Sequence, residues 1–89
     1  MRAVITVIGK DSLGIIADVS AKCALFGANI IDISQSVMRE YFAMIMLVEL
    51  DALKEDFSRF AATLSALGEE KGLVINAMHE DIFNAMHRI

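Results

Sequence analysis

The sequence predicts an α+β sandwich in which two helices cover one face of a four-stranded sheet. Three observations support this class. Short apolar or β-branched segments alternate with segments whose apolar residues recur every three or four positions. Glycine stands at several junctions between these segments, and the chain contains no proline. The 89 residues are 56% hydrophobic and 22% charged, which is enough apolar material for one packed domain spanning residues 1–89.

The first half of the chain is predicted to form a strand, a helix and a second strand. Residues 2–9 are β-branched and end at a glycine, which indicates a buried strand. Over residues 14–26 the apolar side chains share one helical face, with Ser12 as a candidate N-cap and Gly27 at the C-cap position. Residues 29–38 alternate apolar and polar side chains, so this strand is expected to have one wet face.

The second half repeats this order after a polar turn. Residues 41–50 are apolar on both faces, as expected for a central strand. Residues 51–71 show helical spacing with Asp51 as a candidate N-cap, and residues 73–79 form a last strand. The tail, residues 80–89, has the pattern of a short amphipathic helix.

The order strand, helix, strand, strand, helix, strand is the plan of the ferredoxin-like fold, here followed by a short C-terminal helix. Right-handed crossovers set the first and third strands in the middle of the sheet and the second and fourth at its edges. The apolar character of the first and third strands agrees with this arrangement.

Composition excludes several functions. The net charge of −4 is unfavourable for binding nucleic acid. A single cysteine allows neither an intrachain disulfide nor a cysteine zinc cage, and His79 and His87 lack the spacing of a helical metal pair. No apolar run is long enough to span a membrane, and no signal peptide is evident at the start. A reduced, cytoplasmic location is therefore expected, with no cofactor and no metal.

The stretch from Gly9 to Ile33 carries the functional signal. Gly14 opens a helix, where the lack of a side chain lets another group approach free N–H groups that accept a carboxylate. Asn29 both donates and accepts hydrogen bonds, which suits the paired charges of an amino acid. We expect this loop and the start of the second strand to lie at the same end of the sheet and to line one pocket. Each residue also has an explanation that needs no ligand. Gly14 then marks only a turn between strand and helix, and Asn29 only bonds to backbone groups at the start of the strand.

These residues resemble a known family. The segments 11–17 (DSLGIIA) and 25–30 (LFGANI) resemble the signature of ACT domains, in which the loop usually reads Asp-Arg-Pro-Gly-Leu. Here Ser12 and Leu13 replace the Arg and Pro, which removes rigidity from the loop. The flanking residues 9–11 and 32–35 are similar to free-standing ACT proteins and to the ACT halves of the glycine-cleavage transcriptional repressor.

The resemblance implies a non-catalytic regulatory module. Such a module binds an amino acid or similar small effector at the interface of a homodimer and acts through a separate partner protein. The ligand-binding residues that it implies are Asp11, Leu13, Gly14, Ile15, Asn29, Ile30 and Ile31.

Two other functions compete with this one. A ligand-free assembly module would use strand edges and the apolar tail residues Ile82, Phe83, Met86 and Ile89. An acylphosphatase-like enzyme needs an arginine in the loop after the first strand, where this chain offers only Lys10, and no Ser–His or Cys–His pair stands at suitable positions. The chain is therefore not expected to be an enzyme.

Overall fold

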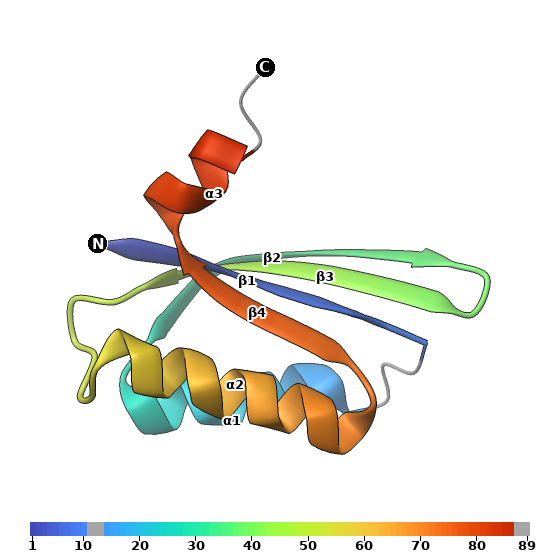
Figure 1. The fold of residues 1–89 in the computed structure, drawn as a ribbon, viewed down its shortest axis with the longest axis horizontal. Helices are drawn as coiled ribbons and strands as arrows, with labels where there is room; N and C mark the ends of the chain where they lie inside the picture. Colours follow the sequence, from blue (N-terminus) through green and yellow to red (C-terminus); the bar gives the residue numbers. More distant parts are fainter. Residues whose placement is uncertain (11–13, 87–89) are drawn as a thin grey trace.

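The computed structural model describes residues 1–10 and 14–86. The elements within them are β1 (Arg2–Gly9), α1 (Ile15–Phe26), β2 (Asn29–Met38), β3 (Tyr41–Glu49), α2 (Phe57–Lys71), β4 (Val74–His79) and α3 (Glu80–Met86). The sheet order is β2-β3-β1-β4, and all neighbouring strands are antiparallel. Helices α1 and α2 lie on one face of the sheet, and α3 stands away from the other (Figure 1). The predicted ferredoxin-like fold is confirmed, with β1 and β3 central.

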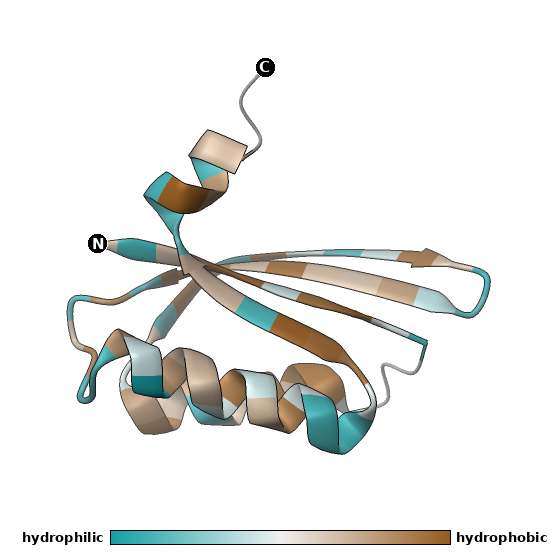
Figure 2. Cartoon of the chain, in the orientation of Figure 1, coloured by the Kyte–Doolittle hydropathy of each residue, from teal (hydrophilic) through white to brown (hydrophobic). Residues whose placement is uncertain are grey.

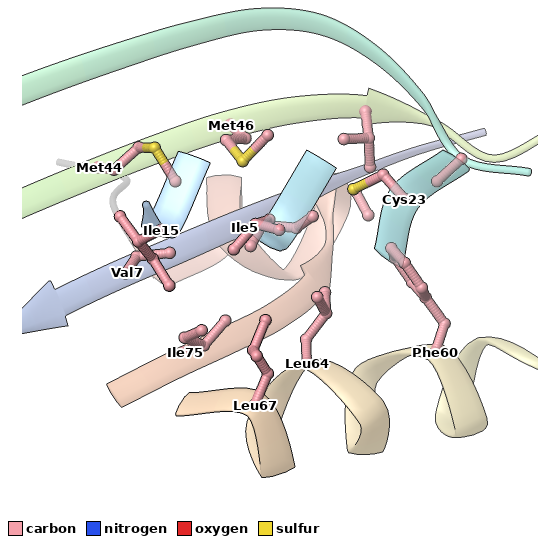
Figure 3. Packing of buried hydrophobic residues seen from close by; sticks show 14 of the residues in the cluster. Ile5, Val7, Ile15, Cys23, Met44, Met46, Phe60, Leu64, Leu67 and Ile75 are labelled. Carbon is pink, nitrogen blue, oxygen red and sulfur yellow. The ribbon is translucent and has the colours of Figure 1, made fainter. Parts of the chain in front are cut away.

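The hydrophobic core lies between the sheet and the two long helices (Figure 3). Each layer contributes large apolar side chains, and the described residues include no buried polar or charged side chain. The largest fully buried side chains are Ile5, Val7, Ile15, Val19, Cys23, Met44, Met46, Val48, Phe60, Leu64 and Ile75. Burial raises the pKa of the Cys23 thiol to about 11, so this side chain behaves as a small hydrophobe, as its position on the buried helical face suggests.

Helix α2 begins at Phe57, six residues later than the predicted start at Asp51. Asp56 occupies the N-cap, while the preceding residues form a connection held by contacts distant in sequence. The N–H of Lys54 donates to the carbonyl of Phe26 at 2.8 Å. Asp51 accepts a hydrogen bond from the N-terminal ammonium at 2.9 Å instead of capping the helix.

Helix α1 is bounded at both ends by glycines in the left-handed conformation. Gly14 is the N-cap with φ 74°, so the helix starts at Ile15, and the predicted cap Ser12 lies outside the described residues. Gly27 is the C-cap with φ 82°, as predicted. A Cβ on Gly27 would lie 2.3 Å from the carbonyl oxygen of Ala52, so both the conformation and the space require glycine there.

Candidate functional site

The start of α1 has a glycine at its N-cap, and the described residues leave space beside it. Within the described part of the chain, no side chain forms a cap hydrogen bond at Gly14 and no atom lies within 4 Å of a Cβ added there. The Gly14 carbonyl accepts a hydrogen bond from Asp18 at 3.0 Å, which begins the helical ladder. The first N–H groups of a helix have no intrahelical partner and carry the positive end of the helix dipole. This end of α1 therefore suits an anionic group such as a carboxylate.

The residues around Gly14 determine which groups of a ligand can contact this helix start. Ile15 is buried in the core, so only its backbone is available to a ligand, although the resemblance implies a contact there. Asp18 is held at 3.1 Å by Lys71 from the end of α2, so part of its negative charge is compensated. Asp11 and Leu13, the other predicted contacts in this loop, lie outside the described residues.

The second predicted cluster is the start of β2. Asn29 is exposed and pairs with Glu49 on β3, while Ile30 is partly buried and packs against the core. The pairing of β2 with β3 shifts register between Ile30 and Asp32, which leaves Ile31 as an exposed bulge residue. An amide and an exposed apolar side chain therefore lie together at this strand start.

The two clusters do not meet within one chain, so the expectation that they share an end of the sheet is wrong. Gly9, which precedes the loop, pairs with Phe42 at one end of β3. Asn29 pairs with Glu49 at the opposite end. The physical reason is that β2 runs parallel to β1, so α1 must carry the chain back along the whole sheet before β2 begins. The 12 residues of α1 span about 18 Å.

The structure also contains a pocket that sequence reasoning missed. It has a volume of about 800 Å³ and lies where β1 begins and β4 passes into α3. Its lining residues are Met1, Arg2, Glu49, His79, Glu80, Asp81 and Ile82. No local motif signals this pocket, because its residues come from three distant parts of the chain.

The cations of this pocket are already paired with carboxylates. The N-terminal ammonium binds Glu49 at 3.1 Å and Asp51 at 2.9 Å, and Arg2 binds Glu80 at 2.8 Å. The hydrogen bond from the ammonium lowers the pKa of Asp51, and the hydrogen bonds to Asp51 and Glu49 raise the pKa of the ammonium. Because both cations are paired with carboxylates and Asp81 adds a further negative charge, the pocket offers little to an anionic ligand.

His79 also lies at this junction, on the helix side of the sheet. Its ring packs on Phe57 with a centroid distance of 4.2 Å and an interplanar angle of 30°. Its Nδ1 atom is buried and has no hydrogen-bond partner among the described residues. Those residues also contain no group of three or more His, Cys, Asp or Glu side chains that could hold a metal ion.

The fold defines the class: a four-stranded antiparallel ferredoxin-like sheet with two helices on one face. The chain belongs to the ACT domain family, whose model matches residues 2–78. ACT domains are typically regulatory and bind small ligands. Among its relatives is a UPF0237 protein of Listeria monocytogenes, 45% identical over 89 residues that span all of both chains. A UPF0237 protein of Methanococcus maripaludis is 49% identical over 99% of this chain and 98% of its own.

Solved structures agree with this assignment. An ACT domain protein from Streptococcus pneumoniae matches with a TM-score of 0.81 and 46% identity over 98% of both chains. A protein assigned as a glycine cleavage system transcriptional repressor matches with a TM-score of 0.71 and 28% identity, over 86% of this chain and 44% of its own. The predicted resemblance to this group is confirmed. No helix among the described residues is long and apolar enough to cross a membrane.

Proposed function

We propose that this chain is a cytoplasmic, non-catalytic regulatory domain that binds an amino-acid-like effector between two copies of itself and signals to a separate partner protein. The observation that carries the proposal is the start of α1 at Gly14, where the described residues supply no side-chain cap and leave space for a ligand. Membership of the ACT family supports a small ligand. The acidic net charge argues against nucleic acid as the partner.

The separation of the two predicted clusters supports a site shared between copies. Strand β2 is at an edge of the sheet, where its outer backbone groups are available for pairing. Two copies that pair antiparallel along β2 exchange ends about a two-fold axis. The Asn29 end of one copy then lies beside the Met38 end of the other, which is the end of the sheet where β1 stops and α1 begins. Each dimer has two such sites.

The chemistry of this shared site fits a free amino acid. The helix start at Gly14 binds the carboxylate through backbone N–H groups. The side chain of Asn29 from the other copy binds the ammonium through its amide oxygen. The exposed side chain of Ile31 from that copy packs against the apolar part of the effector.

The first experiment compares Gly14→Asp with Gly14→Asn in a thermal-shift screen against the twenty amino acids, followed by calorimetric titration of any hit. Asp and Asn both tolerate the left-handed conformation of this position, so the pair differs mainly in charge. We expect the carboxylate of the Asp variant to compete with the effector and to weaken binding at least tenfold more than Asn does. Equal affinities for the two variants would contradict a carboxylate site at Gly14.

Mixing two variant chains tests whether the site is shared. We expect Gly14→Asp and Asn29→Ala to lose binding separately. A mixed dimer has one site that carries both changes and one site that carries neither, so mixing should restore part of the binding. If both residues served one site within a chain, every site in the mixed dimer would remain damaged and no binding would return.

A further inference from the structure

The sheet face opposite α1 and α2 is apolar and only partly covered. Val4 points to this face, since it alternates with core residues and lies outside the core cluster, yet it is only 4% exposed. α3 contacts β1 and β4 at this end. At the other end of the same strands, the cross-strand neighbours Ile8 and Val74 are 57% and 59% exposed. Tyr41 and Ile45 on β3 are about half exposed beside them.

Helix α3 leaves much of its apolar surface exposed to solvent. It stands away from the sheet (Figure 1), and apolar residues recur along it (Figure 2). Ile82 is 52% exposed and Met86 is 64% exposed, although both belong to the apolar stripe of this helix. One chain therefore presents an apolar projection at one end of the face and an uncovered apolar surface at the other.

We infer that this face is a second self-interface, in which α3 of each copy packs over the Ile8–Val74 end of another copy. Two-fold symmetry supports a second copy of the chain as the partner at this face. A two-fold axis parallel to the sheet and perpendicular to its strands reverses each strand and turns the two faces toward each other. Since α3 contacts one end of β1 and β4, the same operation places the partner's α3 at the opposite ends of β1 and β4, where Ile8 and Val74 are exposed.

The charges agree with the same arrangement. The first turn of α3 is acidic, with Glu80 and Asp81. Glu80 is paired with Arg2, whereas Asp81 has no ion pair among the described residues. Lys10 follows β1 at the far end of the sheet, where its ammonium lies 5.8 Å from the Tyr41 ring centroid. Reversal of the strands brings Asp81 of one copy to the end that holds Lys10 of the other.

The available area suits a protein interface. The exposed apolar side chains on this face and on α3 are Ile8, Tyr41, Ile45, Val74, Ile82 and Met86. Each of these side chains is between 46% and 64% exposed, so about half of its surface is available to a partner. Together with their polar surroundings they approach the roughly 800 Å² that each partner contributes to a standard interface. This two-fold axis is perpendicular to the one proposed for β2, and with the two axes intersecting the two interfaces close into a particle of four chains.

The test is the mass of the particle measured by light scattering during size-exclusion chromatography. Ile8→Glu should halve the mass, because each two-fold contact would then bury two carboxylates against the partner's α3. Ala66→Glu is the matched control: Ala66 is exposed on α2, away from both proposed interfaces, and this variant should keep the wild-type mass. A wild-type protein with the same mass as Ile8→Glu would overturn the inference.

A charge exchange identifies the occupant as a second copy. Asp81→Lys and Lys10→Glu should each shift the particle toward half mass at low salt, and the double variant should restore it. Failure of the double variant to recover the mass would exclude this pairing. The inference is also separable from the effector proposal: Ile8→Glu should keep the response to an effector, whereas Gly14→Asp should keep the mass. If Ile8→Glu halves the mass of the particle but the wild-type protein responds to no amino acid, the self-interface is supported and the effector site is contradicted.

Discussion

His79 shows how one atom can lower the stability of a packed junction. Its ring packs on Phe57, but its Nδ1 atom is buried without a partner among the described residues. A buried polar atom without a hydrogen bond costs about 1–3 kcal/mol, which the ring contact only partly offsets. This residue closes β4 immediately before α3, so the cost falls where the chain leaves the sheet.

We therefore expect His79→Phe to raise the free energy of unfolding by about 1 kcal/mol, because an aromatic ring is kept while the unpartnered nitrogen is removed. Urea denaturation at pH 8 followed by circular dichroism measures the change. His79→Asn is the control, since it keeps polar atoms but loses the ring, and it should destabilise the protein. A less stable Phe variant would contradict an energetic cost from an unpartnered Nδ1.

At the scale of single residues, sequence reasoning was most successful where chemistry is local. Gly27 was identified as a C-cap, and Cys23 was placed on the buried helical face. Asp51 was misplaced as a helix cap because its partner, the N-terminal ammonium, is 50 residues away in the sequence. Local propensity contains no information about such a contact.

At the scale of elements, the end of α1 is fixed by its neighbour. The N–H of Gly27 bonds within the helix end, and the next connection passes so close that a Cβ would meet the Ala52 carbonyl oxygen. Gly72 ends α2 with nearly the same φ, 73° against 82°, but no described residue lies within 4 Å of a Cβ there. Comparing the two glycines therefore separates the free-energy cost of a left-handed side-chain-bearing residue from the cost of steric overlap with Ala52.

Alanine at these positions should reveal that difference. Gly72→Ala should cost roughly 1–2 kcal/mol of unfolding free energy, from the left-handed conformation alone. Gly27→Ala should cost that amount plus roughly 1–3 kcal/mol for the overpacked contact. Chemical denaturation of both variants gives the two values. Equal losses would mean that the Ala52 connection moves aside freely.

The periodicity of the sequence predicted the order and type of all seven elements. It predicted only part of how these elements are arranged in space. Right-handed crossovers predicted that β2 lies at the edge and β3 in the centre, and the polar alternation of β2 and the apolar run of β3 agree with this order. The grouping of Gly14 with Asn29 failed because a motif read along the sequence ignores the direction in which α1 returns the chain. The helical pattern of the tail predicted α3 but not the face that it contacts.

At the scale of the whole molecule, the beginning of the chain is tied to the end of β3. The N-terminal ammonium bonds to Glu49 and Asp51, and the Met1 carbonyl accepts from the N–H of Leu50 at 2.8 Å. These contacts fix the beginning of β1 beside the connection that leads into α2. The ion pairs are exposed, so their contribution depends on the charge of both partners.

The pKa directions set the pH range of this contribution. The pKa of Asp51 is lowered in the folded protein by the hydrogen bond from the ammonium, so its stabilisation is present above the ordinary value of 3.8 and is lost as pH falls through the lowered value. The pKa of the ammonium is raised by Asp51 and Glu49, so its stabilisation is complete below 8.0 and is lost as pH rises through the raised value.

We expect Asp51→Asn to destabilise the protein most between about pH 4 and pH 8 and to converge with the wild type on both sides of that range. Thermal unfolding of the two proteins from pH 2 to pH 10 measures the difference. Ser65→Ala, an exposed change on α2, serves as the control for unrelated pH effects. A difference that does not vary with pH would show that the ion pair contributes nothing.

The bulge at Ile31 has a consequence for unwanted aggregation. A regular edge strand accepts almost any extended peptide in several registers, and this chain has no proline to prevent it. The bulge interrupts the even spacing of backbone groups near the start of β2, so an added strand fits only along the regular part that follows. At the opposite edge, β4 has six residues and passes directly into α3, which limits the length available there. The two edges of the sheet therefore resist open-ended growth into fibrils by different means, one by irregular spacing and the other by shortness.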